Sequence, residues 1–301
     1  MTRDFPASAP RLQPRPRLSR VPPTGLVLVA IASVQLGAAF AKSLFDDVGP
    51  PGAVFLRVLF AAVLLGALWR PRPGAHTGAE LRLAAIFGLT LAAMNLSFYE
   101  AFDRIPLGVA VTLEFIGPLG VAVAGSRRAL DVVWVTLAGG GVLLLAAPWS
   151  AGSVSGAGVA FALLAGAFWA AYIVVNERVG RTFAGGSGLA LAMAFGSVLL
   201  VPAGLASGGT DLLDPAVLAV GATVAVLSSA IPYSLELEAL RRLPPRVFGV
   251  LMSLEPAVAA LAGLAVLGQV LAPREVAGIA LVVTASLGAS RSAAVAEPGA
   301  V

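Results

Sequence analysis

Long apolar stretches follow one another along most of this chain, and they constrain its fold more than any other feature. A transmembrane α-helix needs roughly 20 mainly apolar residues, and only 12% of the 301 residues are charged. Because a backbone in lipid must satisfy its own hydrogen bonds, such stretches predict helices. The sequence therefore predicts an all-α integral membrane protein with ten transmembrane helices. The expected windows are 24–45, 50–69, 81–101, 105–125, 131–148, 156–177, 185–206, 215–239, 244–268 and 274–291.

The basic residues fall mostly on one side of this predicted topology. If the amino terminus is cytoplasmic, 16 of the 20 Lys and Arg residues lie in cytoplasmic segments, whereas Arg104 and Arg274 lie outside. Cytoplasmic loops carry such an excess, so both termini are expected in the cytoplasm. Since the charges are sorted by membrane side and not gathered on one face, no nucleic-acid partner is expected. The 16 residues are Arg3, Arg11, Arg15, Arg17, Arg20, Arg70, Arg72, Arg82, Arg127, Arg128, Arg178, Arg181, Arg241, Arg242, Arg246 and Arg291.

The two ends of the chain are expected to lie outside the folded part. Residues 1–23 combine five arginines with many prolines, which is typical of a disordered basic tail. A secretory signal is the competing interpretation, but the apolar run over 24–45 is long enough to span the membrane and lacks a clear cleavage pattern. Residues 292–301 are expected to form a second cytoplasmic tail.

Two segments of the chain resemble each other at a shift of 138 residues. Residues 104–118 align without gaps with residues 242–256, and both segments begin with Arg-x-Pro and end with proline. The shift spans five windows, and an odd number places the two copies in the membrane in opposite orientations. Inverted repeats of this kind bind substrate near the midplane, between the two halves. We therefore expect two five-helix repeats, over 24–148 and 156–291.

Two glutamates lie near the middle of apolar windows, where an acid is costly. Glu114 is about ten residues from either end of its window, and Glu255 is similarly central. An acidic residue at mid-bilayer costs about 2.5 to 3.5 kcal/mol on insertion scales, so each is a candidate functional group. Under the 138-residue shift Glu255 matches Gly117, one helical turn from Glu114. Both acids are expected to face one cavity, although each could instead only bridge helices through a hydrogen bond.

Three prolines inside windows predict helix kinks: Pro118, Pro232 and Pro256. A proline has no backbone N–H, so the carbonyl four residues earlier loses its helical partner and must face protein or water. A transporter can expose backbone to a polar substrate in this way, but a plain kink is equally compatible. Around Pro232 a polar cluster extends toward the predicted cytoplasmic end, where its acids could also reach the interface or pair with nearby arginines. Its members are Ser228, Ser229, Tyr233, Glu236 and Glu238.

Two cations lie within the first two windows. Arg57 is in the middle of the second window, and a buried arginine needs an acid partner, for which Glu114 and Glu255 are nearest in depth. The alternative is a salt bridge that only fixes helix packing. Lys42 lies near the outer end of the first window, where a lysine side chain can reach the interface.

The sequence lacks the motifs of several classes of enzyme and metal-binding protein. The chain contains no cysteine, no phosphate-binding loop, no Gly-x-Ser-x-Gly elbow and no His/Cys metal cluster. The sequence therefore predicts neither an enzyme nor a bound metal or cofactor. Transport driven by an ion gradient remains the simplest interpretation.

Several motifs in order along the chain resemble the threonine and homoserine exporter (RhtA-type) branch of the EamA drug/metabolite transporters. The resemblance runs from about Thr24 to Arg291. It departs at Gly268-Gln269, where relatives commonly carry Gly-Glu, so an acid role at that position is in doubt. The segments that carry the resemblance are Ala41-Lys-Ser-Leu-Phe45, Pro106-Leu-Gly-Val-Ala-Val-Thr-Leu-Glu-Phe-Ile-Gly-Pro-Leu119, Ser126-Arg-Arg128, Leu227-Ser-Ser-Ala-Ile-Pro-Tyr-Ser-Leu-Glu236 and Gly249-Val-Leu-Met-Ser-Leu-Glu-Pro-Ala257.

The resemblance implies a ten-helix inner-membrane exporter of small amino acids and related metabolites, which exchanges them for protons. A zwitterionic substrate would place its carboxylate toward Arg57 and its ammonium toward Glu114 or Glu255. Another small metabolite or a drug-like amine remains an alternative cargo, and a structural membrane protein that transports nothing is an alternative of another class. The positions that the resemblance implies for the site are Lys42, Arg57, Glu114, Ser229, Tyr233, Glu236 and Glu255.

Overall fold

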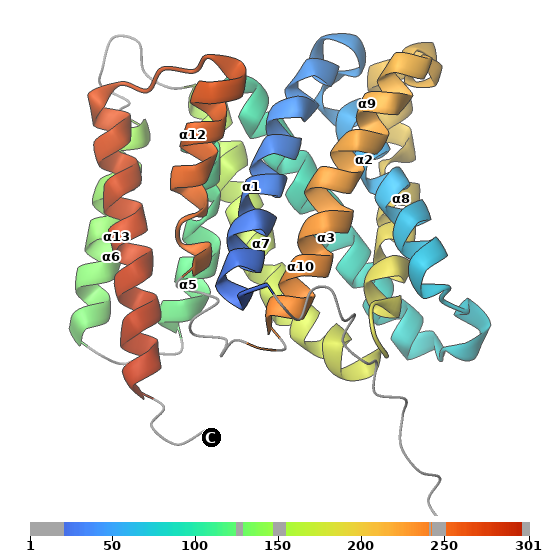
Figure 1. Cartoon of the computed structure of the whole chain (residues 1–301), viewed down its shortest axis with the longest axis horizontal. Helices are drawn as coiled ribbons and strands as arrows, with labels where there is room; N and C mark the ends of the chain where they lie inside the picture. The colour runs from blue at the N-terminus through green and yellow to red at the C-terminus, as the bar shows by residue number, and fades with distance from the viewer. Residues whose placement is uncertain (1–20, 125–128, 147–154, 241, 243–250, 297–301) are drawn as a thin grey trace, which may run out of the picture.

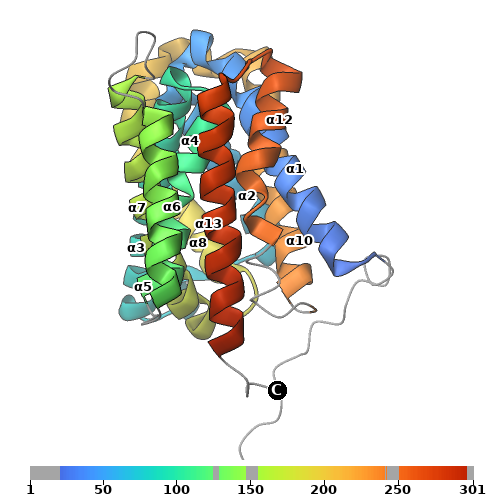
Figure 2. The same cartoon turned by 90° about the vertical axis from the view of Figure 1, so that its left-hand side faces the viewer.

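A computed structural model describes residues 21–124, 129–146, 155–240, 242 and 251–296. These residues form a bundle of helices that run between two ends of the molecule (Figures 1 and 2), and no β-strand occurs within them. The α-helices are α1 Pro23–Ala41, α2 Phe45–Trp69, α3 Gly78–Arg104, α4 Leu107–Glu114, α5 Ile116–Ala124, α6 Ala129–Ala146, α7 Gly156–Thr182, α8 Ser187–Gly208, α9 Pro215–Ala225, α10 Ile231–Leu240, α12 Glu255–Leu267 and α13 Pro273–Ala296.

Several of these helices are long and apolar enough to cross a membrane. Five such segments occur among the described residues, and shorter apolar helices cover Leu107–Val121, Val132–Leu145 and Glu255–Leu267. The predicted all-α membrane fold is therefore confirmed. The five long segments are Pro23–Trp69, Gly78–Arg104, Gly156–Thr182, Ser187–Leu213 and Pro215–Tyr233.

The first of these segments is two helices and not one. It has 47 residues, which at about 1.5 Å per residue would be more than twice the thickness of the apolar core of a bilayer. The chain turns back through a 3₁₀ turn at Lys42–Leu44 and a break at Gly49, whose φ of 66° favours glycine. Residues 46–49, which lie between the first two predicted windows, were expected only to connect them, but helical structure continues on either side of Gly49.

Most helices pack against one or two partners that are distant in the sequence. α2 packs against α8, α3 against α7 and α8, α6 against α13, α1 against α10 and α12, and α4 against α7 and α12. In Figure 1, α1 begins and α13 ends at the bottom of the view, which we call the lower end. The opposite, upper end carries the end of α12. The described parts nearest the two termini therefore lie at the same end of the bundle.

Three helices are interrupted inside the bundle, and each interruption lies close before a predicted kink proline. The expected helix over 105–125 breaks at Phe115, ahead of Pro118. A π-helical segment, Val226–Ala230, precedes Pro232. α12 begins only at Glu255, directly before Pro256, so Glu255 is not in the middle of a continuous helix as predicted. The first part of that window, 244–250, lies outside the described residues.

α7 passes very close to the break between α4 and α5. A Cβ added to Gly166 would lie 2.6 Å from the carbonyl oxygen of Glu114, and one added to Gly117 would overlap the backbone of Gly166. Backbone atoms cannot give way as a flexible side chain can, so only glycine permits this approach. The contact fixes the backbone of Glu114 against α7.

We expect Gly166→Ala to destabilise the protein by about 1 to 3 kcal/mol, because the added methyl group overpacks against backbone. The control is Gly180→Ala on the same helix, where an added Cβ meets nothing within 4 Å. That change should be neutral or stabilising, since alanine favours helix over glycine by up to about 1 kcal/mol. Thermal melting of the two detergent-purified variants measures both effects on stability. Equal melting temperatures for Gly166→Ala and Gly180→Ala would contradict the close packing at Gly166.

Candidate functional site

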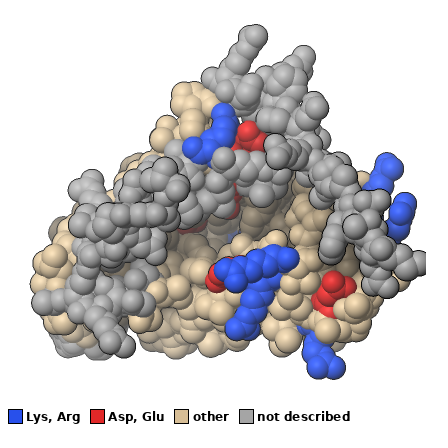
Figure 3. All heavy atoms as spheres, turned by 90° about the horizontal axis from the view of Figure 1, so that it is seen from below, with Lys and Arg blue, Asp and Glu red and all other residues tan. Residues whose placement is uncertain are grey.

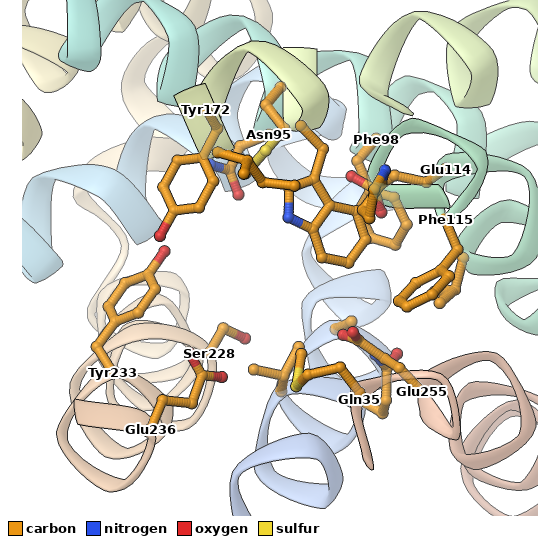
Figure 4. A pocket seen from close by; sticks show the side chains of 18 of the residues that line it. Gln35, Asn95, Phe98, Glu114, Phe115, Tyr172, Ser228, Tyr233, Glu236 and Glu255 are labelled. Carbon is orange, nitrogen blue, oxygen red and sulfur yellow. The ribbon is translucent and has the colours of Figure 1, made fainter. Parts of the chain in front are cut away.

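A cavity of about 420 Å³ lies among the helices of the described structure. Side chains from both halves of the chain line it (Figure 4), and Figure 3, which views the lower end, shows that face hollowed between the helices. Its size is typical of small-molecule sites. The polar and charged residues that line it are Gln35, Arg57, Asn95, Glu114, Tyr172, Asn176, Ser228, Tyr233, Glu236, Glu255 and Ser286.

The two glutamates singled out from the sequence both line this cavity. Glu114 is the last residue of α4 and is 8% exposed, and its carboxylate forms no hydrogen bond or ion pair with the described residues. Glu255 is the first residue of α12 and is 7% exposed, and its Oε1 accepts a hydrogen bond of 3.0 Å from Nε2 of Gln35. The two helices pack against each other. The structure thus brings the two acids to one cavity through two neighbouring helix ends.

Arg57 on α2 also lines the cavity, but its partners differ from the expected ones. Its Nη2 donates to the carbonyl oxygen of Ser228 at 3.1 Å, and its Nη1 donates to Tyr99 Oη at 3.4 Å. No ion pair between Arg57 and an acid occurs among the described residues, so the direct pairing expected with either glutamate is not formed, although Arg57 lies near enough to Glu114 for their charges to attract. The physical reason is Pro232, which leaves the Ser228 carbonyl without its helical donor. Arg57 supplies that donor.

The other predicted site residues separate into two groups. Tyr233 and Glu236 on α10 line the cavity, and so does Pro118, whereas Ser229 is buried beside it without lining it; its neighbour Ser228 takes that place. Pro232 and Pro256 do not line the cavity either. The remaining acid of the polar cluster, Glu238, pairs with Arg242 at 3.4 Å between Oε1 and Nε, one of the pairings considered from the sequence.

Lys42 lies away from the cavity, in the 3₁₀ turn that follows α1. Its Nζ is 2.8 Å from Oδ1 and 3.1 Å from the carbonyl oxygen of Asp103, and it lies 4.7 Å from the centre of the Phe45 ring. The side chain is 30% exposed. Lys42 therefore joins the end of α3 to the turn between α1 and α2, which is not a place from which it can touch the cavity's contents.

Comparison with known proteins decides which kind of protein carries this cavity. A model of the EamA-like transporter family matches residues 156–291. The threonine/homoserine exporter RhtA of Escherichia coli (strain K12) is 43% identical over 270 residues, which cover 89% of this chain and 91% of that protein. The exporter of the same name from Salmonella typhimurium (strain SL1344) is 42% identical over the same shares. The chain belongs to the EamA-like transporter family.

A solved crystal structure supports the fold independently. It covers 91% of this chain and 99% of its own chain with a TM-score of 0.59 and 18% identity, a likeness that shows the fold alone. As an EamA-like transporter the chain is a multi-pass membrane protein and not an enzyme. Among the described residues, no group of three His, Cys, Asp or Glu side chains is placed to hold a metal ion.

The cavity of this EamA-like transporter has an aromatic wall that sequence reasoning missed. Trp169 and Tyr172 on α7 line it together with Phe98 and Phe115. Trp169 meets Phe115 edge to face, with ring centres 5.4 Å apart. The spacing of Trp169, Tyr172 and Asn176 places them on one helix face, but in an apolar window nothing distinguishes a face toward a cavity from one toward lipid. Gln35 and Asn95 were recognisable as polar residues in apolar windows, without a sign that they share this cavity.

We expect single cysteines to show from which side this cavity is reached. The chain has no native cysteine, so labelling of an introduced one has no background. Asn176 lines the cavity near the lower end of α7. A cysteine in its place, Asn176→Cys, should react with a membrane-impermeant thiol reagent added on the side of the termini. Lys42→Cys should react only from the opposite side. Labelling of both variants from the same side of sealed vesicles would contradict the described opening.

Proposed function

We propose that this transporter exports small amino acids such as threonine and homoserine across the cell membrane in exchange for protons. The observation that carries the proposal is the similarity to threonine/homoserine exporters, which extends over 89% of the chain at 43% identity. The cavity in turn offers charges of both signs, as a zwitterionic cargo requires.

The placement of the charges suggests how such a cargo binds. A guanidinium has five N–H donors, and Arg57 uses two of them on Ser228 and Tyr99. The others are available for the carboxylate of an amino acid. Glu114 has no partner among the described residues and lines the same cavity, so it is placed to receive the ammonium. We propose Tyr233, Glu236 and Glu255 as further contributors in the cavity, and supporting roles outside it for Lys42 and Ser229.

We propose a topology of ten transmembrane helices in two inverted repeats, 24–148 and 156–291. The helix pairs support it. A shift by five transmembrane helices carries α1 onto α7 and α3 onto the segment of α9 and α10, and α1 packs against α10 as α7 packs against α3. α2 packs against α8, α4 against α12 and α6 against α13, which are the pairs that such a shift relates.

We propose that the lower end of the bundle faces the cytoplasm, so both termini are cytoplasmic. Arg70 and Arg72 follow α2, and Arg178 and Arg181 lie in the last turns of α7, all at helix ends that point downward in Figure 1. The excess of basic residues at that end supports this orientation, because cytoplasmic segments carry more Lys and Arg. The cavity, which is hollowed toward this end in Figure 3, is then open to its cytoplasmic cargo.

A second candidate cargo is a larger amine. The aromatic wall of Phe98, Phe115, Trp169 and Tyr172 favours it, because aromatic faces attract cations. Counterflow of labelled threonine, homoserine and an aromatic amine into preloaded vesicles distinguishes an amino acid cargo from an amine cargo. Uptake of the amine but of neither amino acid would replace the proposed cargo.

We expect Glu114→Gln to reduce gradient-driven efflux of threonine from loaded vesicles to background, because the variant keeps the shape but loses the charge that binds the ammonium. The control is Glu177→Gln, which removes an exposed acid that pairs with Arg181 at the surface. Efflux by the control should equal that of the wild type. Undiminished and still pH-dependent efflux by Glu114→Gln would reject the proposed role.

A further inference from the structure

One pair of side chains in the cavity leaves two buried acceptor atoms without a donor among the residues that the structure describes. Gln35 on α1 donates Nε2–H to Oε1 of Glu255 on α12 at 3.0 Å. Gln35 Oε1 and Glu255 Oε2 are sealed from solvent and have no partner among the described residues. The two residues are only 2% and 7% exposed, and Figure 4 shows their side chains together at one side of the cavity. Since buried polar atoms are nearly always hydrogen-bonded, two orphan acceptors on one hydrogen-bonded pair of side chains indicate a missing hydrogen.

No cation of the described residues takes the place of that hydrogen. Glu255 forms no ion pair with a described Lys or Arg, and Arg57 directs its hydrogen bonds to Ser228 and Tyr99. An ionised Glu255 would thus be a buried charge stabilised by one amide donor, which is strongly unfavourable in a membrane-spanning bundle. Its place at the start of α12 brings the positive end of the helix dipole near, but that effect is small beside the cost of burying a charge.

The other charged and titratable groups of the cavity come from α2, α4, α7 and α10. Glu114 and Glu236 are acids, and each repels a further negative charge on Glu255. Tyr172 and Tyr233 are neutral phenols, and Arg57 is the one cation among the described lining residues. The surroundings of Glu255 therefore favour its neutral form on balance.

We propose that Gln35 and Glu255 form a proton-holding pair. With a proton on Glu255 Oε2, this O–H donates to Gln35 Oε1 while the amide N–H donates to Glu255 Oε1, so one proton satisfies both orphan atoms and removes the buried charge. On release, the O–H bond breaks, its electron pair stays on the carboxylate, and the proton passes to water entering the cavity. Gln35 changes neither charge nor protonation, and it acts as a positioning residue for Glu255.

With this pair, Glu255 holds the proton and Glu114 binds the ammonium of the cargo. This assignment of roles rests on the proposed proton exchange. Glu255 holds its proton beside α1 through Gln35, whereas Glu114 on α4 has no hydrogen-bond partner among the described residues, so an arriving ammonium is the group that stabilises its carboxylate. The two tasks lie in one cavity, so an arriving cation and the departing proton influence each other directly.

Infrared spectroscopy of the whole purified protein in lipid, at neutral pH and without cargo, tests the pair. A protonated carboxyl group has a C=O band distinct from that of a carboxylate, and hydrogen bonds lower its frequency. We expect Glu255→Gln to remove one such band and Gln35→Met, of similar length but without an amide, to shift it to higher frequency. Asn95→Leu is the matched control, because it removes another amide of the cavity and should leave the band in place.

A spectrum in which Glu255→Gln removes no protonated carboxyl band would overturn the pair, and so would a Glu255 band that Gln35→Met leaves unshifted. If Gln35→Met does not fold, Gln35→Asn provides the same test, since its amide is one methylene too short to reach. The measurement needs no cargo and is independent of the proposed function. A wild-type protein without threonine counterflow but with a band sensitive to Gln35 would refute amino acid export and still support the proton-holding pair.

Discussion

Polar groups inside a membrane bundle must find partners within the protein or in a wet cavity, and this requirement organises the site. The clearest case is the carbonyl of Ser228. Pro232 deprives it of a helical donor, and Arg57 on α2 supplies one at 3.1 Å. A break in one helix thus fixes the position of the cation that faces the cavity. The same principle sets Glu114 and Glu255 at helix ends, where the backbone is interrupted and the side chains point into the cavity.

Close helix packing converts these local breaks into a defined geometry. Gly166 on α7 allows the backbone of Glu114 to approach, and α4 packs in turn against α12, which begins at Glu255. Gln35 on α1 then reaches the carboxylate of Glu255. Each of the two acids is consequently held by a different neighbour, α7 for Glu114 and α1 for Glu255. Glu114 and Glu255 can therefore have different functions although they lie on related helices.

The sequence predicted the class of fold and much of the site, for identifiable reasons. Apolar length marks membrane helices, and an acid such as Glu114 or a proline such as Pro232 stands out in an apolar window because lipid makes both costly. The partners of these residues were harder to predict. The pairing of Arg57 with a carbonyl depends on which way the backbone around Ser228 turns, and the aromatic wall depends on how α7 is rotated. Both are set by packing between distant segments, which leaves no local signal.

The most direct measurement is calorimetry of threonine binding at one pH in buffers with different protonation enthalpies. If an ammonium entering the cavity displaces the proton held there, binding should release about one proton per threonine, because two linked ligands of one site oppose each other reciprocally. The measured heat then changes with the buffer, and this dependence disappears in Glu255→Gln. Threonine binding with a heat that is the same in every buffer would contradict a carrier in which the two acids couple cargo to protons.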